Sequence, residues 1–364
     1  MQLRDVTLRE AAQLPDRSYT RAQRREAGEH LAKLTPAFIQ AGFPATGPPD
    51  PAVVRDLAAS LNTSVTALAR PLDGDLEAAF DTDPDVVDLF APLSDRQLTH
   101  SVNTSLETVV SMLIDAHDRV QEQGFTPHVS LVDAFRTETS RLVDFSRMLP
   151  GATPLFLADT VGCRTPDEVR GKLSALETRG VDLSRVGVHF HDDIGVATAN
   201  VLAAAGAGVG YADVSVASLG ERAGNPALEE VVVSAYLSQC DTFGIDRTGL
   251  IPTCTAVLEA LGETVGDRKA IVGETVTTHE SGIHTEAMLA EPSTFEPFDP
   301  KKFGGSRTLL FGEQTGESGA AALLDRIGID ADPAEFLALL REQGPLTRDE
   351  ASALARQQFD CETN

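Results

Sequence analysis

The chain has 364 residues, of which 42% are apolar, so it is long enough to bury a large core and exceeds one small domain. Its 55 acidic and 30 basic residues leave a net charge of −25, which repels nucleic acid and anionic membrane surfaces and excludes partners of both kinds. The four cysteines form no CxxC pair, and the N-terminus has no apolar signal core. We therefore expect a cytoplasmic protein with a heavily solvated, acidic surface of the kind suited to high salt.

Short apolar runs alternate with segments of helical periodicity along the first 220 residues or so. The segments between the runs are rich in Ala, Leu, Glu and Arg at helical spacing. Strand–helix alternation repeated eight times predicts an α/β fold, a (β/α)8 TIM barrel. A doubly wound open sheet is the competing architecture, but no GxGxxG motif follows the first run. The eight runs are 3–8, 37–43, 64–69, 86–91, 128–133, 155–159, 186–190 and 212–217.

The alternation stops near residue 250. Beyond it, the sequence predicts isolated helices, an irregular arm at 291–312 and one or two terminal helices at 333–358. We therefore predict a catalytic barrel at 1–250, a linker and arm subdomain at 251–330, and a helical tail at 331–364.

Polar residues follow three strands that become neighbours when a barrel closes. Arg9 and Glu10 follow the first strand, His189 and His191 end the seventh, and Asn225 follows the eighth. Strand alternation points both imidazoles to one face, and catalytic groups of such barrels lie at the carboxyl ends of strands. Two imidazoles, a carboxylate and an amide oxygen suit Zn²⁺, Mn²⁺, Co²⁺ or Fe²⁺. Taken singly, the histidines could be a polar-face pair, Arg9 an ion-pair partner and Asn225 a turn residue.

Seven motifs then occur in an order typical of one enzyme family. They are DVTLREAAQ (5–13), IQAGFP (39–44), ALAR (67–70), ADTVGCRTP (158–166), HFHDDIGVATAN (189–200), GERAGN (220–225) and HESGIH (279–284). The sequence resembles the 2-isopropylmalate, homocitrate and citramalate synthases, which are metal-dependent enzymes of the DRE-TIM metallolyase superfamily. That superfamily also includes 4-hydroxy-2-oxovalerate aldolases and hydroxymethylglutaryl-CoA lyase. The resemblance runs from residue 3 to about 330, and its last motif, with TFEPFDP behind it, favours the synthases.

The resemblance implies a Claisen-type condensation of acetyl-CoA with a 2-oxo acid, giving a 2-hydroxy-dicarboxylate and CoA, in amino-acid biosynthesis such as that of leucine. It implies a divalent metal (Zn, Mn, Mg or Co) held by Glu10, His189, His191 and Asn225. It further implies that Arg9 stabilises the oxyanion, that Glu10 is part of the catalytic set, that His284 transfers a proton, and that Gln13, Ser130, Thr160 and His128 contact the substrate. In the family His284 comes from the partner subunit, so a homodimer with exchanged arms is implied. Leucine-regulated members carry a C-terminal effector-binding domain, for which we expect no room here.

Several positions depart from the family's pattern. The usual RDGEQ or REGEQ is REAAQ, Val132 replaces a glutamate on the fifth strand, and Phe295 replaces a tyrosine of the arm. The stretch GEQTGESG (312–319) lacks the basic residues of the family's GKHSGRHA, which predicts weaker CoA binding or another thioester. His128 stands where homocitrate synthases place an arginine, which argues against 2-oxoglutarate and favours isopropylmalate-like or citramalate-like chemistry. Two alternatives stay open: an aldolase or lyase using the same metal site, and a non-catalytic paralogue.

Overall fold

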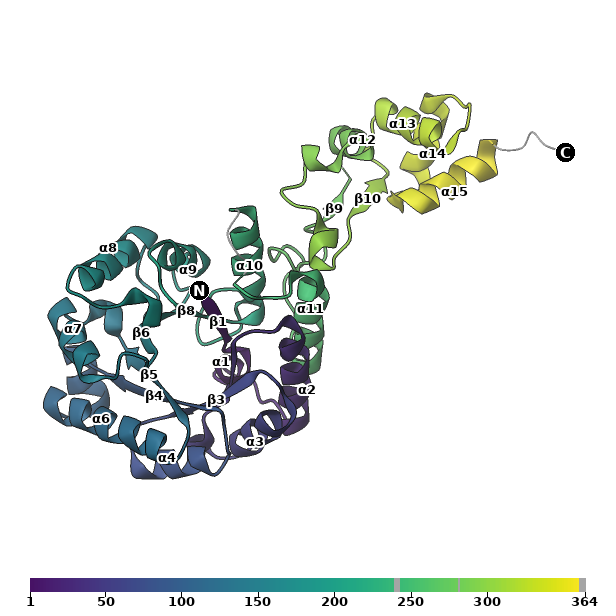
Figure 1. The fold of residues 1–364 in the computed structure, drawn as a ribbon. Helices are drawn as coiled ribbons and strands as arrows, with labels where there is room; N and C mark the ends of the chain where they lie inside the picture. The colour runs from purple at the N-terminus through teal and green to yellow at the C-terminus, as the bar shows by residue number, and fades with distance from the viewer. Residues whose placement is uncertain (239–242, 281, 360–364) are drawn as a thin grey trace. The chain divides into compact units, whose positions relative to one another are not determined.

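The computed structural model describes residues 1–238, 243–280 and 282–359 (Figure 1). The chain forms two compact units, Met1–Thr264 and Val265–Asn364. Of the cysteines, Cys163 is exposed and Cys254 is buried, whereas Cys240 and Cys361 lie outside the described residues. Within the described part of the chain, no helix has the length and apolar character needed to cross a bilayer.

Eight parallel strands of the first unit close into a barrel in the order β1 to β8 (Figure 1). The barrel closes at β1, where Asp5 pairs with Ile39 of β2 on one side and with Val214 of β8 on the other. Each strand falls on one of the apolar runs, so the predicted TIM barrel is confirmed. The strands are β1 (Gln2–Asp5), β2 (Phe38–Gly42), β3 (Ser64–Ala69), β4 (Val86–Pro92), β5 (Thr126–Val132), β6 (Leu155–Asp159), β7 (Val186–Phe190) and β8 (Tyr211–Val214).

Helices surround the barrel (Figure 1), and the longer ones bury an apolar stripe. In α6 (Leu106–Glu122), buried residues recur every three or four positions from Val109 to Val120. The hydroxyl of Ser105 caps this helix by accepting a hydrogen bond from the Thr108 N–H. The other helices of the unit are α1 (Thr7–Ala11), α2 (Arg21–Leu31), α3 (Asp50–Ser60), α4 (Asp73–Phe80), α5 (Asp95–Gln97), α7 (Thr139–Met148), α8 (Pro166–Glu177), α9 (Ala197–Gly206), α10 (Leu228–Leu237) and α11 (Leu250–Leu261).

The helix α11 extends the first unit beyond the point at which we expected the barrel region to end. Its buried residues, from Leu250 to Leu261, form an apolar face, and it packs against α2. Gln23 of α2 donates a hydrogen bond to the carbonyl oxygen of Leu261. This helix therefore belongs with the barrel, and the unit ends at Thr264.

The second unit has a core of its own. A three-stranded sheet in the order β11-β10-β9 is covered by helices, and Phe311, Leu323, Phe336 and Leu340 are fully buried in the shared core. The C-terminal region is helical, as predicted, and contains two terminal helices. Its elements are β9 (Thr278–His279), α12 (Gly282–Ala290), β10 (Thr308–Phe311), α13 (Glu317–Ile327), α14 (Pro333–Gln343), β11 (Leu346–Thr347) and α15 (Arg348–Phe359).

Candidate metal and substrate site

A cavity of about 470 Å³ opens within the first unit and is lined by residues of every strand of the barrel. Its lining includes Arg9, Glu10, Thr160, His189 and His191. The barrel thus brings together residues that lie up to 182 positions apart in the sequence, in the place where such folds carry their chemistry.

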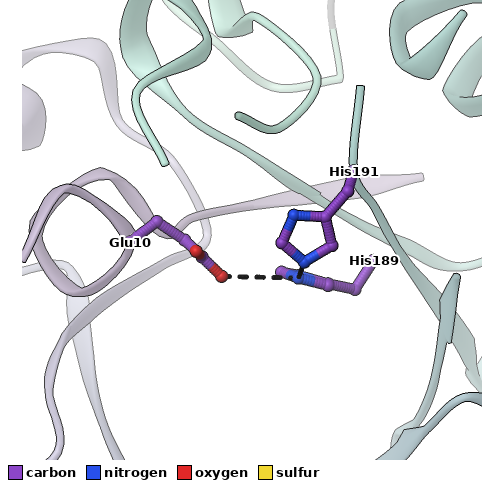
Figure 2. A group of neighbouring side chains, drawn as sticks. All are labelled: Glu10, His189 and His191. Carbon is purple, nitrogen blue, oxygen red and sulfur yellow. Dashed lines mark hydrogen bonds and ion pairs between the residues drawn. The ribbon is translucent and has the colours of Figure 1, made fainter. Parts of the chain in front are cut away.

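Glu10 and the two histidines form the centre of this cavity. One ligand atom of each lies within 4.8 Å of the others (Figure 2). His189 Nε2 is 3.3 Å from His191 Nε2 and 3.4 Å from the Glu10 Oε1 oxygen. His189 Nδ1 donates to the Asp213 carboxylate at 2.9 Å, so the lone pair on its Nε2 is directed toward Glu10 and His191. Side chains arranged in this way can hold a metal ion.

The protonation states of these groups suit metal binding. Burial, followed by the neighbouring His189, lowers the pKa of His191 to about 3. Burial alone raises the pKa of Glu10, but Arg9 and the two imidazoles outweigh it and bring the pKa below its ordinary value. At neutral pH the site therefore offers a carboxylate and a neutral imidazole, which are the forms that ligate metals.

Buried oxygens without hydrogen bonds test whether a metal fits. Among the described residues, no group donates a well-formed hydrogen bond to either carboxylate oxygen of Glu10. Arg9 Nη1 forms an ion pair with Glu10 Oε1 at 2.5 Å. The Oδ1 oxygen of Asn225 is likewise buried without a partner among the described residues. Buried oxygens normally find partners, so these are the atoms that a divalent cation would satisfy.

Asn225 is held by the strand that carries the histidines. Its Nδ2 donates to the carbonyl oxygen of Phe190, which lies between His189 and His191 in the sequence, at 3.0 Å. Asn225 is fully buried, and a side chain at Gly220 would begin 2.2 Å from its Oδ1 oxygen. The Asn225 side chain is therefore anchored to β7 and not only to its own turn. Because Gly220 has no side chain, the space beside Asn225 Oδ1 stays open.

Arg222 ties together the loops that surround the site. Its guanidinium donates to both carboxylate oxygens of Asp193, at 2.8 and 2.9 Å, and to the carbonyl oxygen of Thr160 at 2.8 Å. The loops after β6, β7 and β8 are joined in this way. A bidentate pair of this kind fixes orientation as well as distance.

Arg9 faces the cavity and is oriented by two glutamines. Its Nε donates to Gln40 Oε1 at 2.7 Å and its Nη1 to Gln13 Oε1 at 3.2 Å. Arg9 also forms an ion pair with Glu10, which is the alternative role that the sequence left open. The ion pair does not remove Arg9 from the cavity lining. The predicted residue Gln13 is thus placed beside Arg9.

Thr160 and Ser130 both line the cavity but differ in their hydrogen bonds. Thr160 Oγ1 accepts from the Asp133 N–H at 2.8 Å, which leaves its own proton free to donate into the cavity. The Ser130 hydroxyl donates to Asp88 at 2.8 Å. Ser130 can therefore only accept from a ligand, whereas Thr160 can donate to one.

His128, which the family resemblance predicts to contact the substrate, packs among aromatic rings inside the barrel. His128 is fully buried and is absent from the cavity lining, because its ring packs between Phe38, at 5.0 Å between centroids, and Phe156, at 5.7 Å. Burial lowers its pKa to about 3. Its ring is a neutral part of the aromatic packing inside the barrel.

His284 lies in the second unit. Its ring stacks on Phe295, with centroids 3.9 Å apart, and the ring of His279 is 6.3 Å away. Phe295 therefore occupies the place beside His284 in which the family's tyrosine was expected. The role of His284 stays a prediction.

A buried charge network next to His189 was missed by the sequence analysis. Arg4 donates to both oxygens of Asp213, at 2.7 and 2.8 Å, and to Asp88 at 2.7 Å. Burial raises the pKa of Asp213, but Arg4 and His189 outweigh it and lower the value to about 2. Gln40 donates to Asp88 at 2.9 Å and so connects this network to Arg9. The available signal was the presence of charged residues inside three apolar runs: Arg4 with Asp5 in the first, Asp88 in the fourth and Asp213 in the eighth.

Comparison with known proteins agrees with this geometry. Residues 1–255 match the HMGL-like family, and residues 271–346 match the family described as homocitrate synthase post-HMGL domain-like. The chain belongs to the HMGL-like family. It is 33% identical to the homocitrate synthase AksA of Methanosarcina mazei over 98% of this chain and 88% of that protein. It is also 33% identical to a protein of Ignicoccus hospitalis named "Probable 2-isopropylmalate synthase", over 93% and 85% of the two chains.

The fold of this HMGL-like chain has counterparts among solved structures. The hydroxymethylglutaryl-CoA lyase of Pseudomonas aeruginosa superposes with a TM-score of 0.66 at 22% identity, over 76% of this chain and 96% of that one. At this identity the likeness establishes the barrel fold alone.

Proposed function

We propose that this protein is an acyltransferase that condenses acetyl-CoA with a 2-oxo acid, giving a 2-hydroxy-dicarboxylate and free CoA, in cytoplasmic amino-acid biosynthesis. The observation that carries the proposal is the group of Glu10, His189 and His191 in an open cavity of an HMGL-like barrel. The relatives that match nearly the whole chain are named as synthases of this reaction type. The likeness to lyases is one of fold only and gives no comparable support to lyase chemistry.

Glu10, His189, His191 and Asn225 would hold a divalent metal, which supplies Lewis-acid polarisation of the substrate's keto oxygen. Glu10 Oε2 and Asn225 Oδ1, which are buried without a hydrogen bond among the described residues, support this assignment. His189 is kept in the ligating tautomer by Asp213.

Arg9 and Thr160 orient and stabilise the 2-oxo acid. Thr160 has a free hydroxyl proton that can be donated to the substrate carboxylate. Arg9 presents a guanidinium, fixed by Gln40, toward the keto oxygen, which becomes an alkoxide when the new bond forms. A donor that is fixed in advance stabilises the developing charge without reorganisation.

The reaction needs a base for the methyl group of acetyl-CoA. We assign this to His284, supplied by the partner subunit of a homodimer with exchanged arms, as the family resemblance implies. Loss of the methyl proton gives a carbon nucleophile, which attacks the keto carbon. The alkoxide formed at the former keto oxygen takes up one proton, equivalent to the proton removed from the methyl group, and becomes the hydroxyl group. Water then cleaves the thioester, so that CoA leaves as a thiol and the acetyl carbonyl becomes the second carboxylate.

The test is release of the CoA thiol from acetyl-CoA by the full chain loaded with Mn²⁺ or Zn²⁺ in high KCl. Pyruvate, 2-oxoisovalerate and 2-oxoglutarate are supplied separately. Thiol release that depends on one 2-oxo acid, and is lost in His189→Ala, is expected. Metal binding without thiol release from any mixture would reject the condensation and favour a non-catalytic paralogue.

A further inference from the structure

Three hydrogen-bond donors at the floor of the cavity converge on one carboxylate. Arg4 Nη1, Gln40 Nε2 and the Ser130 hydroxyl donate to Asp88 at 2.7, 2.9 and 2.8 Å. All four side chains line the cavity. The protein therefore contains its own carboxylate, fully hydrogen-bonded, inside the space that receives the substrate.

The other donors near this part of the cavity are largely engaged. Arg4 serves two carboxylates at once, Asp88 and Asp213. Arg24 donates to Asp50 and to the carbonyl oxygen of Ala41, although its buried Nε has no hydrogen-bond partner among the described residues. A second carboxylate on a substrate would meet a like charge at Asp88, whose neighbouring donors are already taken, which is unfavourable in a buried site.

The rest of the wall near Asp88 is apolar. Phe43 and Phe90 line the cavity with their rings in an edge-to-face contact, 5.5 Å between centroids. Val132 stands on the next strand, two residues beyond Ser130, and also lines the cavity. These side chains suit a hydrocarbon group.

We propose that Asp88 is a specificity-determining residue that restricts the enzyme to 2-oxo acids with an uncharged side chain. Its carboxylate takes the donors that a second substrate carboxylate would need and places a like charge beside them. This inference rests on the proposed function and deepens it. It gives a reason for excluding 2-oxoglutarate that does not depend on His128, which is not in the cavity lining.

The test compares two ligands that differ only at the far end of the chain, 2-oxopentanoate with a methyl group and 2-oxoglutarate with a carboxylate. Each is titrated calorimetrically into the Mn²⁺-loaded full chain without acyl-CoA. We expect the wild-type protein to bind 2-oxopentanoate at least tenfold more tightly. Equal binding, or tighter binding of 2-oxoglutarate, overturns the role of Asp88 and leaves the proposed function intact. Binding of neither ligand to metal-loaded protein rejects the proposed function and the specificity together.

Two variants separate the donor effect from the charge effect. Asp88→Ala frees Arg4, Gln40 and Ser130 and vacates the carboxylate's volume, so the preference for 2-oxopentanoate is expected to fall at least tenfold. Asp88→Asn removes the charge but keeps the volume filled, so a smaller fall is expected. Bound 2-oxopentanoate and an unchanged thermal unfolding profile report an intact barrel. An unaltered preference in a folded Asp88→Ala protein contradicts the proposal. If neither variant folds, the proposal is judged by the affinities of the wild-type protein for 2-oxopentanoate and 2-oxoglutarate.

Discussion

Replacing Asp213 by asparagine is expected to weaken metal binding by about 10- to 100-fold, the usual effect of removing the partner of a ligating histidine. Asp213 accepts from His189 Nδ1 at 2.9 Å and from two nitrogens of Arg4 at 2.7 and 2.8 Å. Asparagine keeps the shape of this group but has a single acceptor oxygen. The side chain is buried, so solvent cannot replace the lost acceptor.

The size of the effect follows from the hydrogen bonds that asparagine cannot make. In the wild-type protein, Asp213 Oδ2 accepts from both Arg4 Nη2 and His189 Nδ1, whereas Oδ1 accepts from Arg4 Nε. An asparagine has one oxygen for these two positions, so in either orientation its amide NH₂ faces a nitrogen of Arg4, which can only donate. A neutral amide oxygen is also a weaker acceptor than a carboxylate for the Nδ1 proton of His189, so the ligating tautomer is held less firmly. Two donors that face each other, together with the weakened hydrogen bond to His189, cost about 1.4 to 2.8 kcal/mol, which corresponds to the expected loss.

The assay is calorimetric titration of Mn²⁺ into chelator-treated wild-type protein and Asp213→Asn. Asp88→Asn is the matched control, because Asp88 also binds Arg4 but does not contact His189. It should bind Mn²⁺ within about threefold of wild type, since a site without contact to the ligands changes affinity little. An affinity of Asp213→Asn within that same range, or an equal loss in the control, would refute the argument that Asp213 orients the ligand.

Three further predictions follow from named contacts. Arg9→Ala is expected to lower kcat by about 10²- to 10³-fold, because oxyanion stabilisation is lost. Steady-state kinetics measure this change, with Arg17→Ala as the control because Arg17 is an exposed residue of the cavity lining. An unchanged kcat in Arg9→Ala contradicts the role of Arg9. Burial holds the pKa of His128 near 3 in the folded protein, whereas the imidazole of the unfolded chain takes up a proton near pH 6.5. The folded state therefore loses stability as the pH falls below about 6.5, by roughly 2 kcal/mol between pH 7 and 5. Denaturant unfolding should show this loss reduced in His128→Phe, and equal pH profiles would argue against a neutral buried ring. Removing metal with a chelator should lower the unfolding temperature, and Mn²⁺ at 100 times its Kd should restore about 2.7 kcal/mol, an effect absent in His189→Ala.

The barrel could be predicted from sequence because its signal is local. Parallel strands covered on both faces are short apolar runs, and eight of them alternate with helical segments. The grouping of Glu10, His189 and His191 could also be predicted, because the two histidines lie at the end of β7, Glu10 follows β1, and only β8 separates these two strands in the closed barrel. Closure of the barrel was enough to place them together.

The charge network could not be predicted, because its contacts are made across the barrel. Arg4 pairs with partners 84 and 209 positions away, and a single charge inside an apolar run does not reveal which strand supplies its partner. The aromatic surroundings of His128 could not be predicted for a related reason. His128 and Ser130 share a face of β5, but a two-residue step moves a side chain by about 6.6 Å along the strand, which is enough to leave the cavity.

The most direct test of the account is the identity of the product formed from acetyl-CoA labelled with ¹³C in its methyl group. The metal-loaded full chain is incubated with this thioester and an uncharged 2-oxo acid such as 2-oxoisovalerate, and the mixture is followed by NMR. A labelled methylene carbon bonded to a quaternary hydroxyl-bearing carbon, formed by wild type and not by His189→Ala, is the predicted result. Labelled acetate alone, with the 2-oxo acid unconsumed, would show thioester hydrolysis without carbon–carbon bond formation and would contradict the assignment of a condensing enzyme.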